Sequence, residues 1–195
     1  MADQEDIKNF FQVPALRSYE TYLGLPSFVG RSKMQSFAYI KEKVWSKIQG
    51  WKERLLSQAR REVLLKAVVQ AVLAFSMSCF RLLDRLCQDL EGLMRRFWWS
   101  HGEDKRKIYW VSWRKLCLPK SGGGMDFCDL RKFNTALLAK QVWRLLHKKN
   151  SLFYKVFKSK FFPTGSVMDA KESHRGSYAW RSILGARKVV ALGIW

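Results

Sequence analysis

The feature that most constrains the fold of this chain is the spacing of apolar residues after Asp129. They recur every three or four positions, at Leu130, Phe133, Leu137, Leu138, Val142, Leu145 and Leu146. This is the period of an α-helix with one buried face, and Asp129 is a good cap for its first turn. The other faces hold lysines and arginines. Such a segment needs other helices to cover its apolar face, so a helical bundle is predicted.

Four other segments have the same helical period, and a fifth helix is expected near the C-terminus. Helices are predicted from Ser32, as a cap, to about Gln49, where Gly50 would end the helix; from Ser57 to about Cys79; from Asp84 to about Phe97; from Ser151 to Phe162; and from Ser177 to about Arg187. The helix after Ser57 is apolar almost all round, so it is expected in the core, with Glu62 and Lys66 paired on its polar stripe. A short helix over Asp6–Phe11 and one strand over Tyr19–Leu25 complete a mainly α fold.

Positive charge is the second strong feature. The net charge is +20, and it is uneven: residues 1–94 carry 14 Lys and Arg against 10 Asp and Glu, whereas residues 95–195 carry 22 against 6. With 48% apolar residues the chain is too hydrophobic for a disordered basic tail. Concentrated positive charge opposes compaction unless an anionic partner is near, and phosphate backbones are the commonest such partner. Nucleic acid is the predicted partner.

Basic residues also lie beside tryptophans. Lysine and arginine neutralise phosphates, and aromatic rings can stack on exposed bases. Most of the nine tryptophans are nevertheless expected in the core, because tryptophan at helical spacing is more often buried than exposed. The lysines and arginines are therefore the candidate contacts, and in the second half of the chain they are Arg95, Arg96, Arg114, Lys115, Lys140 and Arg144.

The residues that catalysis or metal binding would need are scattered. There is no adjacent pair of aspartates for two-metal chemistry, and Asp126 with Asp129 is better explained by surface solubility and helix capping. The three histidines lie far apart, and no GxSxG or phosphate-loop pattern occurs. The four cysteines, Cys79, Cys87, Cys117 and Cys128, form no CxxC pair and are expected as reduced thiols. No catalytic residue, metal site or cofactor is predicted in this chain.

The sequence gives no indication of a membrane or secretory segment. The most hydrophobic stretch, Ala67–Phe80, is interrupted by Gln70 and falls short of the roughly 18 residues expected for a membrane-spanning helix. The acidic N-terminus, with Asp3, Glu5 and Asp6, resembles neither a signal peptide nor a transit peptide. An intracellular protein without a membrane partner is predicted, with nucleus and organelle both open.

Short strings distributed along nearly the whole chain carry a family resemblance. In order they are YLGLP at 22–26, QGWK at 49–52, LSQA at 56–59, EVLLKA at 62–67, MSCF at 77–80, FWW at 97–99, WVSW at 110–113, LCLPK at 116–120, ALLAKQ at 136–141 and SYAWRSIL at 177–184. In these strings and in their order the chain resembles the reverse transcriptase of plant non-LTR, LINE-type retrotransposons, in the region after the catalytic palm.

The resemblance implies a helical thumb that grips template and growing strand without performing the chemistry. Residues 1–31 would be the end of the palm and a linker, 32–100 the thumb-like region and 101–195 a basic helical connecting region truncated at its C-terminus. The partner would be an RNA·DNA hybrid or duplex, contacted also by Lys41, Lys47, Lys52, Arg54, Arg60 and Arg61. The parent family is an RNA-directed DNA polymerase whose Mg²⁺ would be held by the palm, so this chain alone is expected to be no enzyme.

The chain departs from the family pattern at several positions. Arg60 stands where the family usually has glycine, Asp126 replaces a second glycine, and a proline expected near Leu73 is absent. Such losses are expected of a truncated or decayed copy. The alternative is a non-functional or structural fragment that folds only with the missing palm domain.

Overall fold

The structure is a computed structural model that describes residues 21–22, 25–26, 29–30, 32–52, 56–100, 108–171 and 176–193. The chain divides into two compact units, residues 1–37 and 38–195. In the first unit, β1 (Thr21–Tyr22) pairs antiparallel with β2 (Leu25–Pro26), and α2 spans Lys33–Ser36. The described part of the expected strand is thus a pair of two-residue strands. The expected helix over residues 6–11 lies outside the described residues.

The second unit is built from helices, which confirms the mainly α fold. They are α3 (Ala38–Lys52), α4 (Gln58–Val63), the π-helix η1 (Leu64–Val69), α5 (Gln70–Cys79), α6 (Asp84–Trp98), α7 (Trp113–Leu116), the 3-10 helix η2 (Lys120–Gly122), α8 (Leu130–His147), α9 (Leu152–Phe161), α10 (Tyr178–Gly185) and α11 (Arg187–Gly193). The α4, η1 and α5 segments follow one another without a break and form the helix predicted after Ser57.

Side-chain caps begin several of these helices. Ser57, Asp129, Ser151 and Ser177 each accept a hydrogen bond from a backbone N–H in the first turn that follows. The prediction that Ser32 caps the first long helix is wrong, because its side chain makes no such bond and the helix is interrupted at Phe37.

The expected end of the first long helix at Gly50 is also wrong, because α3 continues to Lys52. The two added residues include Trp51, which packs against Phe97 of α6 with ring centroids 5.6 Å apart. Glycine stops a helix only when the chain turns into the left-handed region there, and this packing favours continued helix instead.

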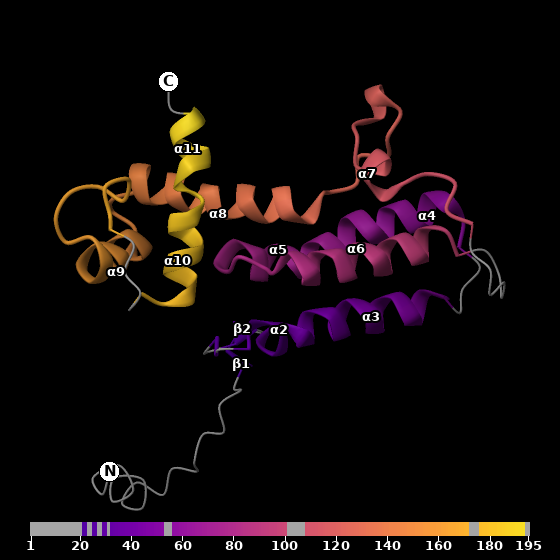
Figure 1. The fold of residues 1–195 in the computed structure, drawn as a ribbon, viewed down its shortest axis with the longest axis horizontal. Coiled ribbons are helices and arrows are strands. Elements are labelled where there is room, and N and C mark those ends of the chain that lie inside the picture. The colour runs from indigo at the N-terminus through magenta and orange to yellow at the C-terminus, as the bar shows by residue number, and fades with distance from the viewer. Residues whose placement is uncertain are drawn as a thin grey trace, which may run out of the picture. The chain divides into compact units, whose positions relative to one another are not determined.

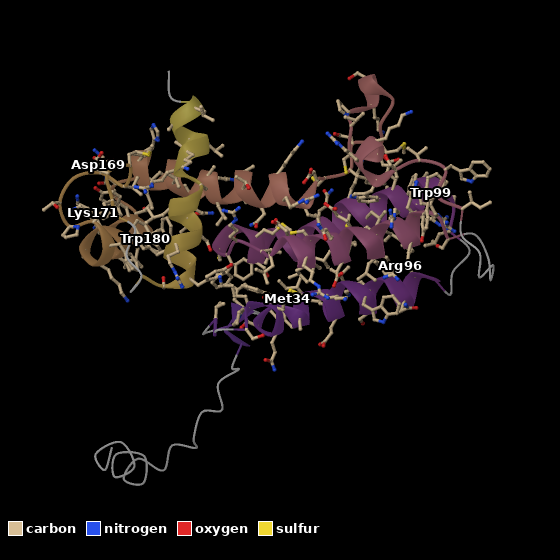
Figure 2. All side chains as sticks on the ribbon, in the orientation of Figure 1. Met34, Arg96, Trp99, Asp169, Lys171 and Trp180 are labelled. Carbon is tan, nitrogen blue, oxygen red and sulfur yellow. The ribbon has the colours of Figure 1, made fainter. Side chains whose placement is uncertain are left out.

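Within the second unit, α5 and α6 lie side by side in a middle layer. Helix α3 packs on α6 and α5 from one side, and α8 packs on both from the other, as Figure 1 shows. Figure 2 shows that side chains fill the spaces between these helices. Each helix therefore covers an apolar stripe of its neighbours, as the 3.6-residue period predicts.

The helix over Gln58–Cys79 is less covered than its sequence predicts. Leu65, Leu73 and Met77 are fully buried, yet Val63 and Phe75 are 62% and 48% exposed. By length and composition it is also long and apolar enough to cross a membrane, which corrects the prediction that no such stretch exists. Its buried side packs against α8, and its ion pair between Lys66 Nζ and Glu62 Oε1 (2.8 Å) is confirmed.

The loop between α7 and α8 is held by close backbone approach. A Cβ at Gly124 would lie 2.0 Å from the Leu118 carbonyl oxygen, so only glycine fits there. Asp126, where the resembled family has glycine, has a φ of +59°, in the left-handed region. Aspartate tolerates this region better than most residues but less well than glycine, so aspartate at this position is less stable than glycine would be.

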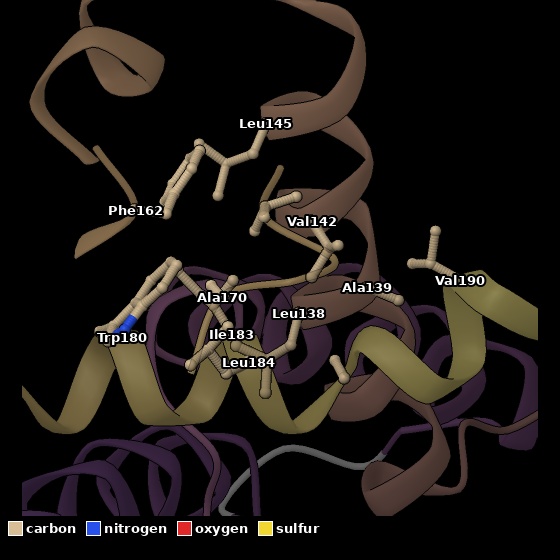
Figure 3. Close-up of a cluster of buried hydrophobic side chains, with 12 residues drawn as sticks. Leu138, Ala139, Val142, Leu145, Phe162, Ala170, Trp180, Ile183, Leu184 and Val190 are labelled. Carbon is tan, nitrogen blue, oxygen red and sulfur yellow. The ribbon is translucent and has the colours of Figure 1, made fainter. Parts of the chain in front are cut away.

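A second apolar cluster joins the C-terminal helices to α8. Leu138, Val142 and Leu145 of α8 meet Ile183 and Leu184 of α10 and Val190 of α11 (Figure 3). Trp180 is 1% exposed, stacks on Phe161 and Phe162, and thereby ties α9 to α10. The C-terminal helices are therefore part of the packed bundle.

A buried amide connects α8 to the turn between α5 and α6. Asn134, 3% exposed, accepts a hydrogen bond from the Leu82 N–H (2.8 Å) and donates to the carbonyl oxygens of Met77 (2.7 Å) and Phe80 (2.9 Å). On the same turn, the Arg81 N–H donates to Ser182 Oγ of α10 (3.0 Å). Polar contacts from two later helices thus fix this turn.

Candidate nucleic-acid interface

The basic residues predicted to contact phosphate fall on several surfaces. Lys41 and Lys47 lie on α3, Arg60 and Arg61 on α4, Arg95 and Arg96 near the end of α6, Arg114 and Lys115 on α7, and Lys140 and Arg144 on α8. The side chain of Lys52 and the whole of Arg54 lie outside the described residues. Among the rest, the structure brings together Lys41, Arg95 and Arg96.

Those three residues line a groove between α3 and α6, which we name the α3–α6 groove. One hollow of about 440 Å³ is lined by Ala38, Lys41, Glu42, Trp45, Leu93 and Arg96. An adjoining hollow of about 290 Å³ is lined by Lys41, Gln88, Asp89, Gly92, Arg95, Arg96 and Tyr109. Lys41 and Arg96, the latter labelled in Figure 2, belong to both hollows.

Charges and rings alternate along the α3–α6 groove. Lys41 Nζ forms an ion pair with Asp89 Oδ2 (2.8 Å). The guanidinium carbon of Arg95 lies 4.7 Å from the centre of the Tyr109 ring, which is cation–π geometry. Trp45 and Tyr109 remain 44% and 40% exposed. The groove therefore brings cations together with partly exposed aromatic rings.

Two other predicted contacts have partners within the fold. An Nη of Arg61 donates to the Trp98 carbonyl oxygen (3.4 Å), and burial lowers the pKa of its guanidinium. An Nη of Arg144 donates to Gln141 Oε1 (3.0 Å), and its guanidinium lies over the Phe153 ring. These arginines join helices to one another, which limits what they can offer a ligand.

The densest positive charge lies on residues 113–171, which we name the cationic segment. It holds thirteen lysines and arginines against three acidic residues, Asp126, Asp129 and Asp169. Eleven of the thirteen are exposed, the others being half-buried Arg144 and Lys158. Of the ion pairs between described residues, one involves this segment, Lys120 Nζ with Glu62 Oε1 at 3.3 Å. Most of these cations thus have no ion-pair partner among the described residues.

A larger hollow, of about 730 Å³, opens at the start of α8. Arg114, Arg131 and Lys132 line it together with Glu91 and Asp129. Glu91 accepts a hydrogen bond from the Leu130 N–H (3.2 Å), and burial raises the pKa of its carboxyl. Asp129 Oδ1 accepts from the N–H groups of Arg131 and Lys132. These carboxyls bind the backbone N–H groups at the start of α8. The positive charge that the hollow presents therefore comes from the exposed side chains of Arg114, Arg131 and Lys132.

The expectation that most tryptophans are buried is wrong for the part of the chain that the structure describes. Trp98, Trp113 and Trp180 are buried, and Trp51 and Trp99 are intermediate. Trp45, Trp110 and Trp143 are 44%, 76% and 48% exposed. The spacing of the tryptophans predicts that they lie on or near helices. It does not predict which faces of those helices are left uncovered by neighbouring helices.

The cysteines are free thiols. Burial raises the pKa of Cys87 and of Cys117 to about 12, so both are protonated at neutral pH and poor nucleophiles. Within the described ranges, no group of three or more His, Cys, Asp or Glu side chains is placed to hold a metal ion. Cations and partly exposed aromatic rings are the groups that the described surface offers for binding.

Comparison with known proteins gives two relatives, both from Arabidopsis thaliana. The first, "Uncharacterized mitochondrial protein AtMg00310", is 46% identical over 125 residues, which are 64% of this chain and 81% of that protein. The second, "Putative ribonuclease H protein At1g65750", is 37% identical over 174 residues, which are 87% of this chain and 28% of that protein. The chain thus spans little more than a quarter of the second relative. No family model and no solved structure matches the chain.

Proposed function

The chain belongs to the same family as the Arabidopsis mitochondrial protein. From the family resemblance of its sequence and from its two relatives, we propose that it is derived from a retrotransposon and binds nucleic acid. The finer proposal is a region equivalent to the thumb and connection of a LINE-type reverse transcriptase, which grips an RNA·DNA hybrid or duplex. A relative named for ribonuclease H is consistent with a nucleic-acid partner.

The observation that carries the proposal is the cationic segment. Thirteen cations with three acidic neighbours repel one another, and phosphates relieve that repulsion while releasing counterions to solution. The segment includes the exposed cations of α7 and the lysines of α8 and α9. Contacts of this kind read the backbone and not the base sequence. A grip that follows template and primer regardless of sequence needs contacts of this kind.

The proposal assigns no catalytic step to this chain. Polymerisation needs carboxylates that hold two divalent ions. Among the described residues, no three or more His, Cys, Asp or Glu side chains are placed to hold a metal ion. In the proposed parent enzyme, the palm would supply those carboxylates and the Mg²⁺. The role proposed for the chain is to hold nucleic acid.

Removing two lysines of α8 and the lysine that follows its last residue is the direct test of the cationic segment. Lys132, Lys140 and Lys148 are exposed, so their replacement by alanine leaves the core intact. We expect the affinity for a 20-base-pair RNA·DNA hybrid at 0.15 M salt to fall about 100-fold, because three phosphate contacts are lost. Fluorescence anisotropy with a labelled hybrid measures the change.

A matched control removes the same charge from other helices. Lys43, Arg85 and Lys188 are exposed residues on α3, α6 and α11. Their combined replacement by alanine is expected to lower the affinity less than about tenfold, since only the long-range attraction changes. Equal losses in the two triple variants would contradict a localised interface.

A further inference from the structure

The α3–α6 groove differs in kind from the cationic segment. Its cations, Lys41, Arg95 and Arg96, are matched by the carboxylates of Glu42 and Asp89, so it is no continuous track for a phosphate backbone. Its two hollows have volumes of about 440 and 290 Å³. Both are close to the smallest volume that is usual for small-ligand sites, about 300 Å³. The groove suits one or two small planar groups better than a rigid duplex.

A glycine lines the smaller hollow of the groove. Gly92 lies in the middle of α6, where glycine weakens a helix relative to alanine. Its φ is not positive, and a Cβ built on it would meet nothing within 4 Å, so neither backbone conformation nor close packing requires glycine there. Gly92 lines the smaller hollow, and any larger residue would reduce that space.

The groove pairs an aromatic surface with a cation at each end. Trp45 lines the larger hollow with Lys41 and Arg96, and Tyr109 lines the smaller one with Arg95 over its ring. An unstacked nucleobase has a flat face that stacks on tryptophan or tyrosine, and its phosphate pairs with lysine or arginine. Bases in a duplex are already stacked on one another and do not present that face.

We propose that the α3–α6 groove binds unpaired nucleotides of a single strand, with a base stacked on Trp45 and its phosphate held by Arg96, beside the ion pair of Lys41 with Asp89. The inference rests on the proposed function for the class of ligand, and it names a second site with a different preference. The cationic segment holds the backbone of a paired region, and the groove holds the unpaired strand that adjoins it.

Two substitutions test the groove by different routes. Trp45→Leu removes the stacking surface without altering charge, and Gly92→Leu fills the smaller hollow. Each is expected to lower the affinity for a labelled 12-nucleotide oligothymidylate about tenfold at 0.15 M salt. Each should leave the affinity for a blunt 12-base-pair RNA·DNA hybrid within about twofold of the unaltered chain, since the hybrid contacts the cationic segment.

The matched controls are Gly92→Ala, which adds one methyl group to the hollow, and Trp143→Leu, which removes an exposed tryptophan on α8. Both are expected to keep oligothymidylate affinity within about threefold. Unchanged oligothymidylate binding by Trp45→Leu and Gly92→Leu would overturn the inference, as would equal losses for strand and hybrid. If the chain binds oligothymidylate through Trp45 but not the hybrid, the groove stands and the proposed duplex grip fails. If the chain binds neither, both fail.

Discussion

Replacing Asn134 with alanine is expected to lower the free energy of unfolding by about 3–5 kcal/mol. The amide makes three hydrogen bonds, to Leu82, Met77 and Phe80, at the turn where α5 ends and α6 begins. Alanine returns none of them, and burying backbone groups after losing such bonds costs about 1–3 kcal/mol each. Since domains are stable by about 5–15 kcal/mol, this variant is expected to lie close to unfolding at room temperature.

Urea denaturation followed by far-UV circular dichroism measures this loss. The control is Thr135→Ala on the same helical turn, where the Thr135 hydroxyl bonds the Arg131 carbonyl oxygen within α8. We expect the control to change stability by less than about 0.5 kcal/mol. A loss below about 1 kcal/mol for Asn134→Ala would refute the structural role of the amide. A wild-type chain with no cooperative transition would instead favour a fragment that folds only with a palm domain.

Replacing Trp180 with alanine is also expected to lower the free energy of unfolding, by about 3–5 kcal/mol. The indole is 1% exposed, and its ring centroid lies 4.7 Å from that of Phe161 and 5.7 Å from that of Phe162, with nearly parallel planes. The Phe157 ring also contacts the indole, with ring centroids 5.7 Å apart. Alanine leaves a large cavity between α9 and α10, and the surrounding rings can close it only in part.

The matched control for this variant is Trp143→Ala. Trp143 is 48% exposed and stacks on His147 of the same helix, with ring centroids 3.9 Å apart. Its replacement is expected to cost less than about 1 kcal/mol, because little apolar area leaves the core. Thermal unfolding of both variants compares them, and similar melting temperatures would contradict the packing of α9 against α10.

The local features of the fold could be predicted from the sequence. Asp129 followed by apolar residues three and four apart predicts the start of α8 and four of its buried residues, because capping and helical period depend on near neighbours. The burial of Asn134 was not predicted, because its hydrogen-bond partners lie more than 50 positions away in the sequence. The end of α3 was mispredicted for the same reason: the contact of Trp51 with Phe97 joins residues far apart in sequence. A prediction based on Gly50 alone cannot include this long-range contact.

The candidate interface was harder to predict from the sequence. Positive charge after residue 94 predicted that many cations of the second half of the chain lie at the surface, since exposure of charged side chains is the rule, and most of those described are exposed. The α3–α6 groove depends instead on which faces of two helices remain uncovered. Trp45 and Tyr109 are 64 positions apart, and no spacing in the sequence indicates that they border adjoining hollows. A mid-helix glycine, Gly92, was the one local signal.

The central claim is that this chain binds nucleic acid through phosphate contacts, and the salt dependence of binding tests it most directly. A labelled 20-base-pair RNA·DNA hybrid is titrated with the whole chain between 50 and 200 mM salt. Four or more phosphate contacts predict that the affinity falls about 100-fold or more over this range, linearly in logarithmic coordinates. No binding at 50 mM salt, or binding that does not change with salt, would contradict the account.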